Sequence, residues 1–552
     1  MKTNVWKCII LCYSLTFSHA SLSVEPPLIV DPKQKQFDEQ TRSTTSSSLL
    51  VPDVVAEVSE QAEEEIANIH FAGGTVIPLP ILTKQVKPLL RQPFDGQEVS
   101  KTLQAITEEY QKRGYPLSYA TAAEESFNQG KLTITLIEGY IARSEVIINH
   151  QDIREKVSKI LAPVLAEKPL QRKTLERAVL LVNRIPGYKF NIQLPKPKTL
   201  SGATSIRIEV QRYRSLEPIL AFSKQQYSDE SLSASIKFNS FDDFFSQATI
   251  TSLVPLKDKD ERYFAFGIEN DWLANGLRGS LLVDFYQDKS QSDLLFNGFD
   301  LDYQQDTKRL TIDYSLSYPL LLTSEQQLTL GAGIKHVNED NRYRLDSQGN
   351  MVGQVESDVS YSLAQISIDY SQLFGDFALI SNLEISNNID LGQSSEEQDG
   401  FYDRGFFIYD ATVHLRYQFL QYWRADLRLN GVYTNDNIAT NEHVSYGGAR
   451  YGSGYPEGQA EGQRGYGGYL KLLREFSMGK FHMSPYLLMD TAHSEFNQGQ
   501  LKRNLSSVAI GAEFGEHSIY SFGVEYAQPM EDDNVITGDK SPIYNVRFSW
   551  QI

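Results

Sequence analysis

The stretch Arg309-Leu310-Thr311-Ile312-Asp313-Tyr314-Ser315-Leu316-Ser317-Tyr318 alternates a polar side chain with an apolar or aromatic one at every step. Alternation with a period of two indicates a β-strand whose two faces meet different surroundings. The same pattern recurs toward the C-terminus at residues 411–419, 424–433 and 544–552. These runs are about ten residues long, which is the length that a tilted strand needs to cross a membrane. The sequence therefore predicts membrane-spanning strands.

A soluble β-sandwich alternates in the same way, so the pattern alone does not identify which face meets lipid. Aromatic side chains near the ends of the runs favour a membrane, because an interfacial girdle lies there. These residues are Tyr318, Phe419, Tyr433 and Trp550. An open sheet is excluded in hydrocarbon, because each unpaired edge group costs several kcal/mol. We therefore predict a transmembrane β-barrel over residues 214–552.

The number of strands follows from closure of the barrel. Roughly seventeen alternating runs are present, and a barrel with both ends on one side needs an even number. We assign residues 294–305 to a long external loop, which leaves about sixteen antiparallel strands. This assignment predicts short turns at residues 319–325, 374–376 and 420–422, and outer loops at residues 338–358, 390–404 and after Gly447.

The N-terminus has the features of a secretory signal peptide over residues 1–20. Lys2 and Lys7 precede an apolar core at residues 8–15, and Ser18-His19-Ala20 fits a small-residue cleavage site. The apolar run is shorter than the roughly 20 residues of a spanning helix. Both cysteines lie in this segment, so we expect no disulfide in the mature chain.

Residues 21–213 predict a linker and two small α/β units. Residues 21–65 are rich in Pro, Ser, Thr and Glu and predict a periplasmic linker, in which residues 33–42 form either a short plug helix or disordered chain. Residues 66–141 and 142–213 each combine helical and strand patterns in the same order. The first unit has a clear helix at residues 97–113, whose shared apolar face is formed by Val99, Leu103, Ile106 and Tyr110.

Charge and motifs exclude several functions. The 552 residues include 52 basic and 70 acidic side chains, and this formal charge of −18 argues against a nucleic-acid partner. No His-Glu-x-x-His motif is present, and the segment around Ser453 lacks the Gly-x-Ser-x-Gly spacing of a hydrolase. No glycine-rich phosphate loop is followed by Lys and Ser or Thr. We predict no enzyme activity, no cofactor and no metal.

A glycine-rich segment at residues 445–466 is the candidate functional element. Its glycines lose much backbone freedom on ordering, so the segment needs surroundings that hold it. Asp490 is the one carboxylate in the mostly apolar run at residues 485–492, and in a membrane strand it must point away from lipid. We predict that the segment folds inside the barrel and that Asp490 faces it.

These features together resemble the two-partner (type Vb) secretion transporters, the haemolysin-activator and filamentous-haemagglutinin exporter family. The two α/β units resemble its POTRA domains, through Gly130-Lys131-Leu132 to Ile137-Glu138-Gly139-Tyr140-Ile141 and through Asn183-Arg184-Ile185-Pro186-Gly187-Tyr188. The resemblance spans nearly the whole mature chain. It implies a fold of two POTRA domains followed by a sixteen-stranded outer-membrane barrel.

The resemblance also implies which residues form the loop motif. The family carries Gly-Gly, then Val-Arg-Gly-aromatic, then Arg-Gly-aromatic, and its arginine falls here on Ser453. In the family that arginine is thought to pair with an aspartate on the neighbouring strand, which matches Asp490. Arg450 or Arg464 is a candidate replacement, and the alternative is that Asp490 simply faces water in the lumen. The motif residues are Gly447, Gly448, Arg450, Gly452, Ser453, Gly454, Tyr455, Arg464 and Gly465, with Asp490 as the partner on the barrel wall.

The resemblance implies an outer-membrane translocator with periplasmic POTRA domains. They would capture an unfolded exoprotein, such as a haemolysin, adhesin or contact-dependent toxin, by strand addition, and the barrel would export it without nucleotide hydrolysis. The expected partners are this exoprotein, outer-membrane lipid and the barrel-assembly machinery, and we expect a monomer. A barrel-assembly insertase is the alternative, although it usually has more than two POTRA units. A plain diffusion porin would give the repeats no purpose.

Overall fold

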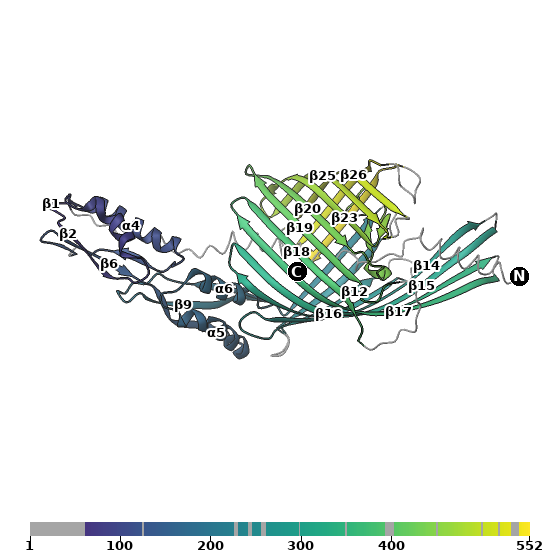
Figure 1. Cartoon of the computed structure of the whole chain (residues 1–552), viewed down its shortest axis with the longest axis horizontal. Helices are drawn as coiled ribbons and strands as arrows, with labels where there is room; N and C mark the ends of the chain where they lie inside the picture. The colour runs from purple at the N-terminus through teal and green to yellow at the C-terminus, as the bar shows by residue number, and fades with distance from the viewer. Residues whose placement is uncertain are drawn as a thin grey trace.

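The computed structural model describes residues 61–551, apart from 124–125, 226–229, 241–245, 255–260, 297–298, 348–349, 392–401, 449–450, 498–500, 517–518 and 532–539. Two small α/β units lead into a closed barrel, and strands β14 to β17 project beyond the barrel end opposite those units (Figure 1). The predicted signal peptide, residues 1–20, and the predicted plug helix, residues 33–42, lie outside the described residues.

The first α/β unit packs helix α4 against a mixed sheet of order β2-β6-β4, with β5 also paired to β6. Asp95 caps α4, because its carboxylate accepts a hydrogen bond from Gln97 N at 2.9 Å. The four residues whose spacing predicted this helix are all buried: Val99, Leu103, Ile106 and Tyr110. The elements are β1 Gln61–Glu65, β2 Asn68–Gly73, α3 Leu79–Val86, the 3₁₀ turn Lys87–Leu89, β3 Pro93–Asp95, α4 Gly96–Lys112, β4 Tyr119–Thr121, β5 Phe127–Asn128 and β6 Lys131–Ile137.

Strand β1 differs from the prediction of an unstructured acidic linker up to residue 65. It pairs antiparallel with β3, with Ala62 opposite Phe94. The side chains of Glu64 and Glu65 are exposed. The strand is therefore held by backbone pairing and has no apolar face, which is why no periodic pattern marked it.

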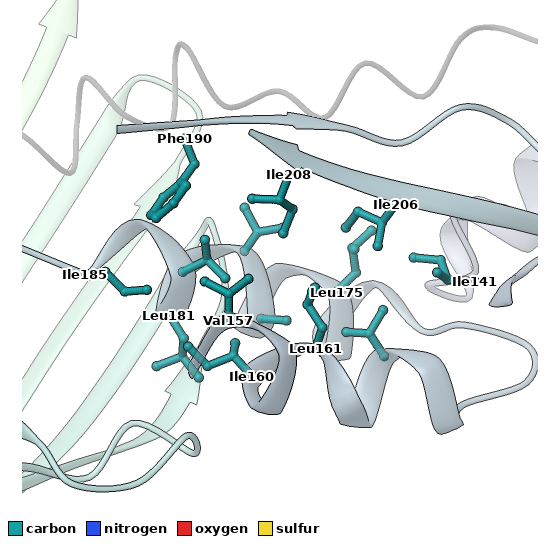
Figure 2. Close-up of a cluster of buried hydrophobic side chains, with 14 of the residues drawn as sticks. Ile141, Val157, Ile160, Leu161, Leu175, Leu181, Ile185, Phe190, Ile206 and Ile208 are labelled. Carbon is teal, nitrogen blue, oxygen red and sulfur yellow. The ribbon is translucent and has the colours of Figure 1, made fainter. Parts of the chain in front are cut away.

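The second α/β unit places helices α5 and α6 against one face of the sheet β7-β9-β8 (Figure 2). Val157, Leu161, Leu175 and Ile208 belong to its fully buried core. Burying each such side chain stabilises the unit by about 1.5–3 kcal/mol. The elements are β7 Tyr140–Ile147, α5 Gln151–Ala166, α6 Arg172–Asn183, β8 Tyr188–Gln193 and β9 Ala203–Tyr213.

Sixteen antiparallel strands close the barrel within the described part of the chain, counting β23 and β24 as one strand interrupted at Glu475. The first strand, β10, closes against the last, β28, with Leu220 opposite Trp550. The strands are β10 Leu216–Gln225, β11 Ser231–Asn239, β12 Gln247–Val254, β13 Arg262–Asp271, β14 Arg278–Phe296, β15 Phe299–Leu322, β16 Gln326–Ser347, β17 Asn350–Phe374, β18 Phe377–Ile389, β19 Phe407–Phe419, β20 Trp423–Tyr433, β23 Arg464–Arg474, β24 Phe476–Met478, β25 Phe481–Glu495, β26 Lys502–Glu516, β27 Tyr520–Pro529 and β28 Ile543–Gln551.

The two faces of the barrel wall differ in chemistry as the alternation predicts. On β15, Leu310 and Ile312 are exposed on the outside, whereas Thr311 between them is buried on the inside. On β25, Met489 is 60% exposed, and its neighbour Asp490 is 6% exposed. An apolar outer band over a polar interior is the pattern of a membrane barrel. Among the described residues, no helix is both long and apolar enough to cross a membrane.

The two ends of the barrel differ in the length of their connections. The predicted short turns at residues 319–325, 374–376 and 420–422 join β15 to β16, β17 to β18 and β19 to β20, which confirms them. At the other end, residues 294–305 were predicted as a loop outside the wall. They instead form the outer ends of β14 and β15, which pair up to Phe296 opposite Phe299. Strands β16 and β17 continue in the same way to Ser347 opposite Asn350.

Candidate functional site

The segment between β20 and β23, residues 434–463, folds back into the barrel, and we call it the inner loop. It contains a short hairpin, β21 Val444–Tyr446 and β22 Ala460–Gly462. The tip between these strands is buried, with Tyr455 fully and Ser453 almost fully inaccessible. Tyr451 and Tyr455 pack against Ala492 and Leu505, which lie on β25 and β26. The glycine-rich tip therefore rests on the inner face of the barrel wall.

Asp490 faces the tip of the inner loop and is held by two serines. The backbone N–H of Ser453 donates a hydrogen bond to Asp490 Oδ2 at 2.9 Å, and the Ser507 hydroxyl donates to Asp490 Oδ1. Ser507 lies directly opposite Asp490 in the pairing of β25 with β26. Ser507 also accepts a hydrogen bond from Gly454 N at 3.0 Å, and its Oγ lies 3.2 Å from Ser453 Oγ. Each carboxylate oxygen thus has a neutral donor.

Neither arginine offered as a partner for Asp490 is seen to fill that role. Arg464 forms an ion pair with Glu495, with 2.6 Å between Nη2 and Oε1. Arg450 lies outside the described residues. Arg464, one of the two candidate replacements for the family's arginine, therefore pairs with Glu495 and not with Asp490. The cross-strand register explains this pairing. Arg464 on β23 lies directly opposite Glu495 on β25, which is five residues from Asp490.

Tyr455 connects the tip to three further parts of the wall. Its carbonyl accepts a hydrogen bond from Gln225 Nε2 on β10 at 3.0 Å. Its hydroxyl donates to Ser506 O at 3.2 Å and accepts from Glu531 N at 3.1 Å. These contacts tie the tip to β10, to β26 and to the residues that follow β27.

Close approach requires glycine at several positions of this region, of which Gly454 and Gly467 are two. A Cβ on Gly454 would lie 2.7 Å from Pro529 N and 2.9 Å from Gln528 C, which are backbone atoms that cannot move aside cheaply. On β23, a Cβ on Gly467 would lie 2.8 Å from the ring of Tyr451. The remaining glycines of the predicted motif are Gly447, Gly448 and Gly452 in the buried tip and Gly465 in β23.

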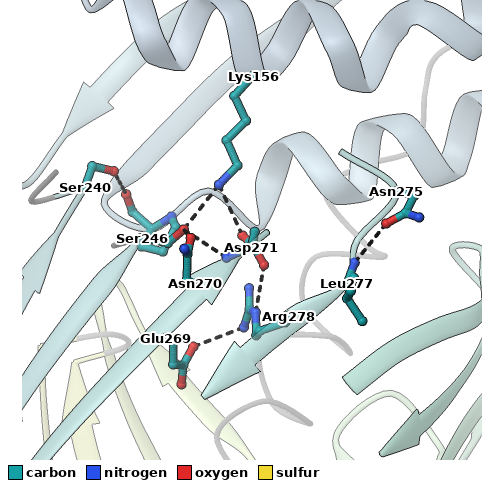
Figure 3. A network of polar contacts seen from close by, with 10 residues as sticks. Lys156, Ser240, Ser246, Glu269, Asn270, Asp271, Asn275, Leu277 and Arg278 are labelled. Atoms are coloured by element: carbon teal, nitrogen blue, oxygen red, sulfur yellow. Dashed lines mark hydrogen bonds and ion pairs between the residues drawn. The ribbon is translucent and has the colours of Figure 1, made fainter. Parts of the chain in front are cut away.

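The second α/β unit is joined to the barrel by a polar network (Figure 3). Lys156 of α5 lies 3.7 Å from Asp271 Oδ2 and donates a hydrogen bond to Ser246 Oγ at 3.2 Å. Arg278 pairs with Asp271 at 2.9 Å and with Glu269 at 3.2 Å. Burial lowers the pKa of Lys156, and the neighbouring Asp271 carboxylate opposes that shift.

The segment Asn183 to Tyr188 contributes a second contact with the barrel. Ser240 donates a hydrogen bond to Pro186 O at 3.0 Å, and Arg214 N donates to Gly187 O at 2.8 Å. A Cβ on Gly187 would lie 2.3 Å from Arg214 O, in the connection from β9 to β10, and 2.6 Å from Cβ of Asn239 on β11, so both approach too closely for any side chain. The residues that resemble the second POTRA signature therefore form part of the junction with the barrel.

Sequence reasoning missed the residues that complete the site. Ser507 and Gln225 each sit on an alternating strand, where the pattern predicts only that a polar residue faces inward. Which inward residues meet depends on the strand register and on the path of the inner loop, and neither can be derived from one sequence. Their only signal is a polar residue on an inward position.

Two family models match the chain. Residues 65–139 match the POTRA domain of ShlB type. Residues 278–514 match the haemolysin secretion/activation protein ShlB/FhaC/HecB. The outer membrane transporter CdiB of Escherichia coli is 24% identical over 166 residues, which are 30% of this chain. That match spans 28% of the length of this curated relative.

Three solved structures share the fold over most of the chain. CdiB from Escherichia coli has a TM-score of 0.69 and 16% identity, covering 94% of this chain and 97% of its own. CdiB from Acinetobacter baumannii has a TM-score of 0.59 and 12% identity, covering 95% and 98%. BamA from Haemophilus ducreyi, lacking POTRA domains 1–3, has a TM-score of 0.51 and 13% identity, covering 89% and 100%.

Proposed function

We propose that this chain, a two-partner secretion transporter by its POTRA and barrel matches, exports an unfolded exoprotein across the outer membrane. In this assignment the barrel spans the outer membrane and the two α/β units, as POTRA domains, lie in the periplasm. The observation that carries the proposal is the inner loop, whose buried tip donates two backbone hydrogen bonds to the wall, from Ser453 N to Asp490 and from Gly454 N to Ser507. Such a loop can close a conduit and still be released from it.

The α/β units are proposed to receive the exoprotein at the edges of their sheets. In the described residues, β7 and β8 are the outer strands of the second sheet, and each pairs with β9 alone. An outer strand presents unpaired N–H and C=O groups to which an extended chain can add. The polar junction with the barrel holds this sheet next to the entrance of the lumen.

Export is proposed to run without nucleotide hydrolysis, on the folding of the exoprotein outside the cell. A β-rich cargo that buries its apolar surface only after it emerges cannot easily return. The role of the barrel is then to provide a polar path and to open and close it. The proposed partners are the exoprotein, outer-membrane lipid and the barrel-assembly machinery, with the transporter acting as a monomer.

The direct test identifies a neighbouring reading frame that encodes a large secreted protein, co-expresses it with this chain, and measures the amount of that exoprotein outside the cell. Secretion should require the full-length chain. Asp490→Ala should reduce secretion while the barrel still folds, shown by the difference in its migration on gels between unheated and heated samples. Unchanged secretion by this variant would remove the loop contact from the mechanism, and absence of secretion with the unaltered chain would remove the function itself.

An outer-membrane insertase is the second candidate, and the likeness to BamA is the observation in its favour. Depletion of the chain separates the two functions. A transporter predicts loss of one secreted protein, whereas an insertase predicts loss of many outer-membrane proteins. The greater likeness to CdiB favours the transporter.

A further inference from the structure

The inner loop makes a second contact with the wall before it reaches its glycine-rich tip. Glu442 Oε1 accepts a hydrogen bond from Lys335 Nζ at 2.8 Å and another from the Tyr361 hydroxyl at 2.7 Å. Lys335 lies on β16 and Tyr361 on β17, and both side chains face the lumen. The side chains of Glu442 and Lys335 are 13% and 25% exposed, so this ion pair is largely shielded from water.

Apolar and neutral polar contacts surround this ion pair. Ile438 and Ala439 of the inner loop are buried against Val337 and Leu363 of the wall. Asn441, which also belongs to the inner loop, accepts a hydrogen bond from Arg309 Nη1 at 2.7 Å. We call this region the stem clamp, and its charged members are Lys335, Glu442, Arg309 and Glu339.

The stem clamp and the tip lie on different sides of the barrel. The stem clamp is on β15 to β17, whereas Asp490 and Ser507 are on β25 and β26. Five strands separate β16 from β25 in the closed barrel, again counting β23 and β24 as one. The inner loop therefore reaches across the lumen between two anchoring points, and release of one end leaves the other in place.

We propose that Glu442 is a second gating residue, which holds the inner loop in the closed pore through Lys335 and Tyr361 independently of Asp490. This inference rests on the proposed function, because it assumes that the loop must leave the lumen during export. The two anchors differ in chemistry. The tip uses neutral donors to a carboxylate, whereas the stem clamp uses an ion pair, so substitutions that unbalance charge should act on the stem clamp alone.

The ion pair between Glu442 and Lys335 predicts how single and double substitutions differ. Removing one member of a largely buried ion pair leaves the other charge without its partner, whereas removing both leaves a neutral site. Glu442→Gln keeps an oxygen that can accept from Tyr361, so it deletes only the charge. The single variants E442Q and K335M should therefore loosen the closed loop more than the double variant K335M/E442Q does.

The experiment measures single-channel currents of the purified full-length protein in planar bilayers. E442Q and K335M should each raise the fraction of time in the open state by roughly tenfold. The double variant should return toward the unaltered protein. The matched control is Glu356→Gln in the same hairpin, whose ion pair with Arg342 is exposed to solvent on both sides. This control should leave the open fraction unchanged.

Two results would overturn the proposal. One is an open fraction that stays the same in E442Q and K335M while Asp490→Asn raises it, and the other is an effect of the double variant equal to the sum of the two single ones. Should E442Q fail to assemble, the charge-swapped variant K335E/E442K provides the same test, and it should close as the unaltered protein does. The proposed function fails separately, if the unaltered protein forms no pore.

Discussion

Asp490 has no cationic partner among the described residues. Its contact with the inner loop can therefore break without separating two opposite charges. Its donors are the backbone N–H of Ser453 and the hydroxyl of Ser507. A backbone donor is present whichever residue occupies position 453, so replacing an arginine by serine does not remove the contact. When the loop leaves, no buried cation is left behind, and Ser507 on the wall still bonds to the carboxylate.

The fit of the tip against the wall predicts the effect of Gly454→Ala. The added Cβ would press on the backbone at Gln528 and Pro529, and overpacking of this kind costs about 1–3 kcal/mol. Amides of residues 444–462 should then exchange hydrogen roughly tenfold faster or more. The matched control is Gly431→Ala on β20, where a Cβ would meet open space. Equal exchange in both variants would show that the tip is not held by this contact.

Alternation was sufficient to predict the direction of Asp490 but not its partners. Period two in the run 485–492 sends Asp490 inward whatever the rest of the chain does. The partners depend on the register of β25 with β26 and on a loop that returns from residue 453. Those are long-range features that one sequence does not reveal. The sequence therefore suggested Arg450 or Arg464 as the partner of Asp490, whereas the donors seen in the structure belong to Ser453 and Ser507.

At the scale of elements, the segment Asn183 to Tyr188 does two things at once. It ends helix α6 and begins β8, and it also contacts the barrel through Pro186 and Gly187. The segment that resembles the signature of the second POTRA domain is therefore also the surface by which this α/β unit attaches to the barrel. This attachment aligns the second α/β unit with the entrance of the barrel.

Gly187→Ala should loosen this attachment. The new Cβ would meet Arg214 O at 2.3 Å, and the positive φ of Gly187, 78°, adds strain. Trypsin should cut the α6 region of the variant in detergent faster than in the unaltered protein. Gly114→Ala is the control, because Gly114 shares a positive φ of 85° but has open space around it. If both variants are cut at the same rate, strain alone explains the effect and the junction is not involved.

Element boundaries were predicted well where one face is apolar and poorly where it is not. Helix α4 and the short turns match, because an apolar face or a tight connection marks each of them. The outer ends of β14 to β17 were expected as loops. These ends lie beyond the apolar band. Charged residues such as Arg342, Arg344 and Glu356 occur there, so the two faces of the strands do not differ clearly in polarity. Backbone pairing extends these strands, together with cross-strand contacts such as the ion pair of Arg342 with Glu356.

At the scale of the whole molecule, the inner loop lies inside the barrel and contacts its wall at two places. The loop is held on β25 and β26 at its tip and on β15 to β17 at its stem. The α/β units attach at the end with short turns, so cargo received there would meet this loop before leaving. We infer that export requires the loop to move out of the lumen.

The most direct measurement locks the tip covalently to the wall. Ser453 Oγ and Ser507 Oγ are 3.2 Å apart, so cysteines at these two positions would place their sulfur atoms next to each other, and the two natural cysteines, Cys8 and Cys12, lie in the first 20 residues. The doubly substituted variant, Ser453→Cys with Ser507→Cys, should secrete the exoprotein only after a reductant is added, while each single variant secretes without it. Undiminished secretion by a fully oxidised double variant would contradict the account.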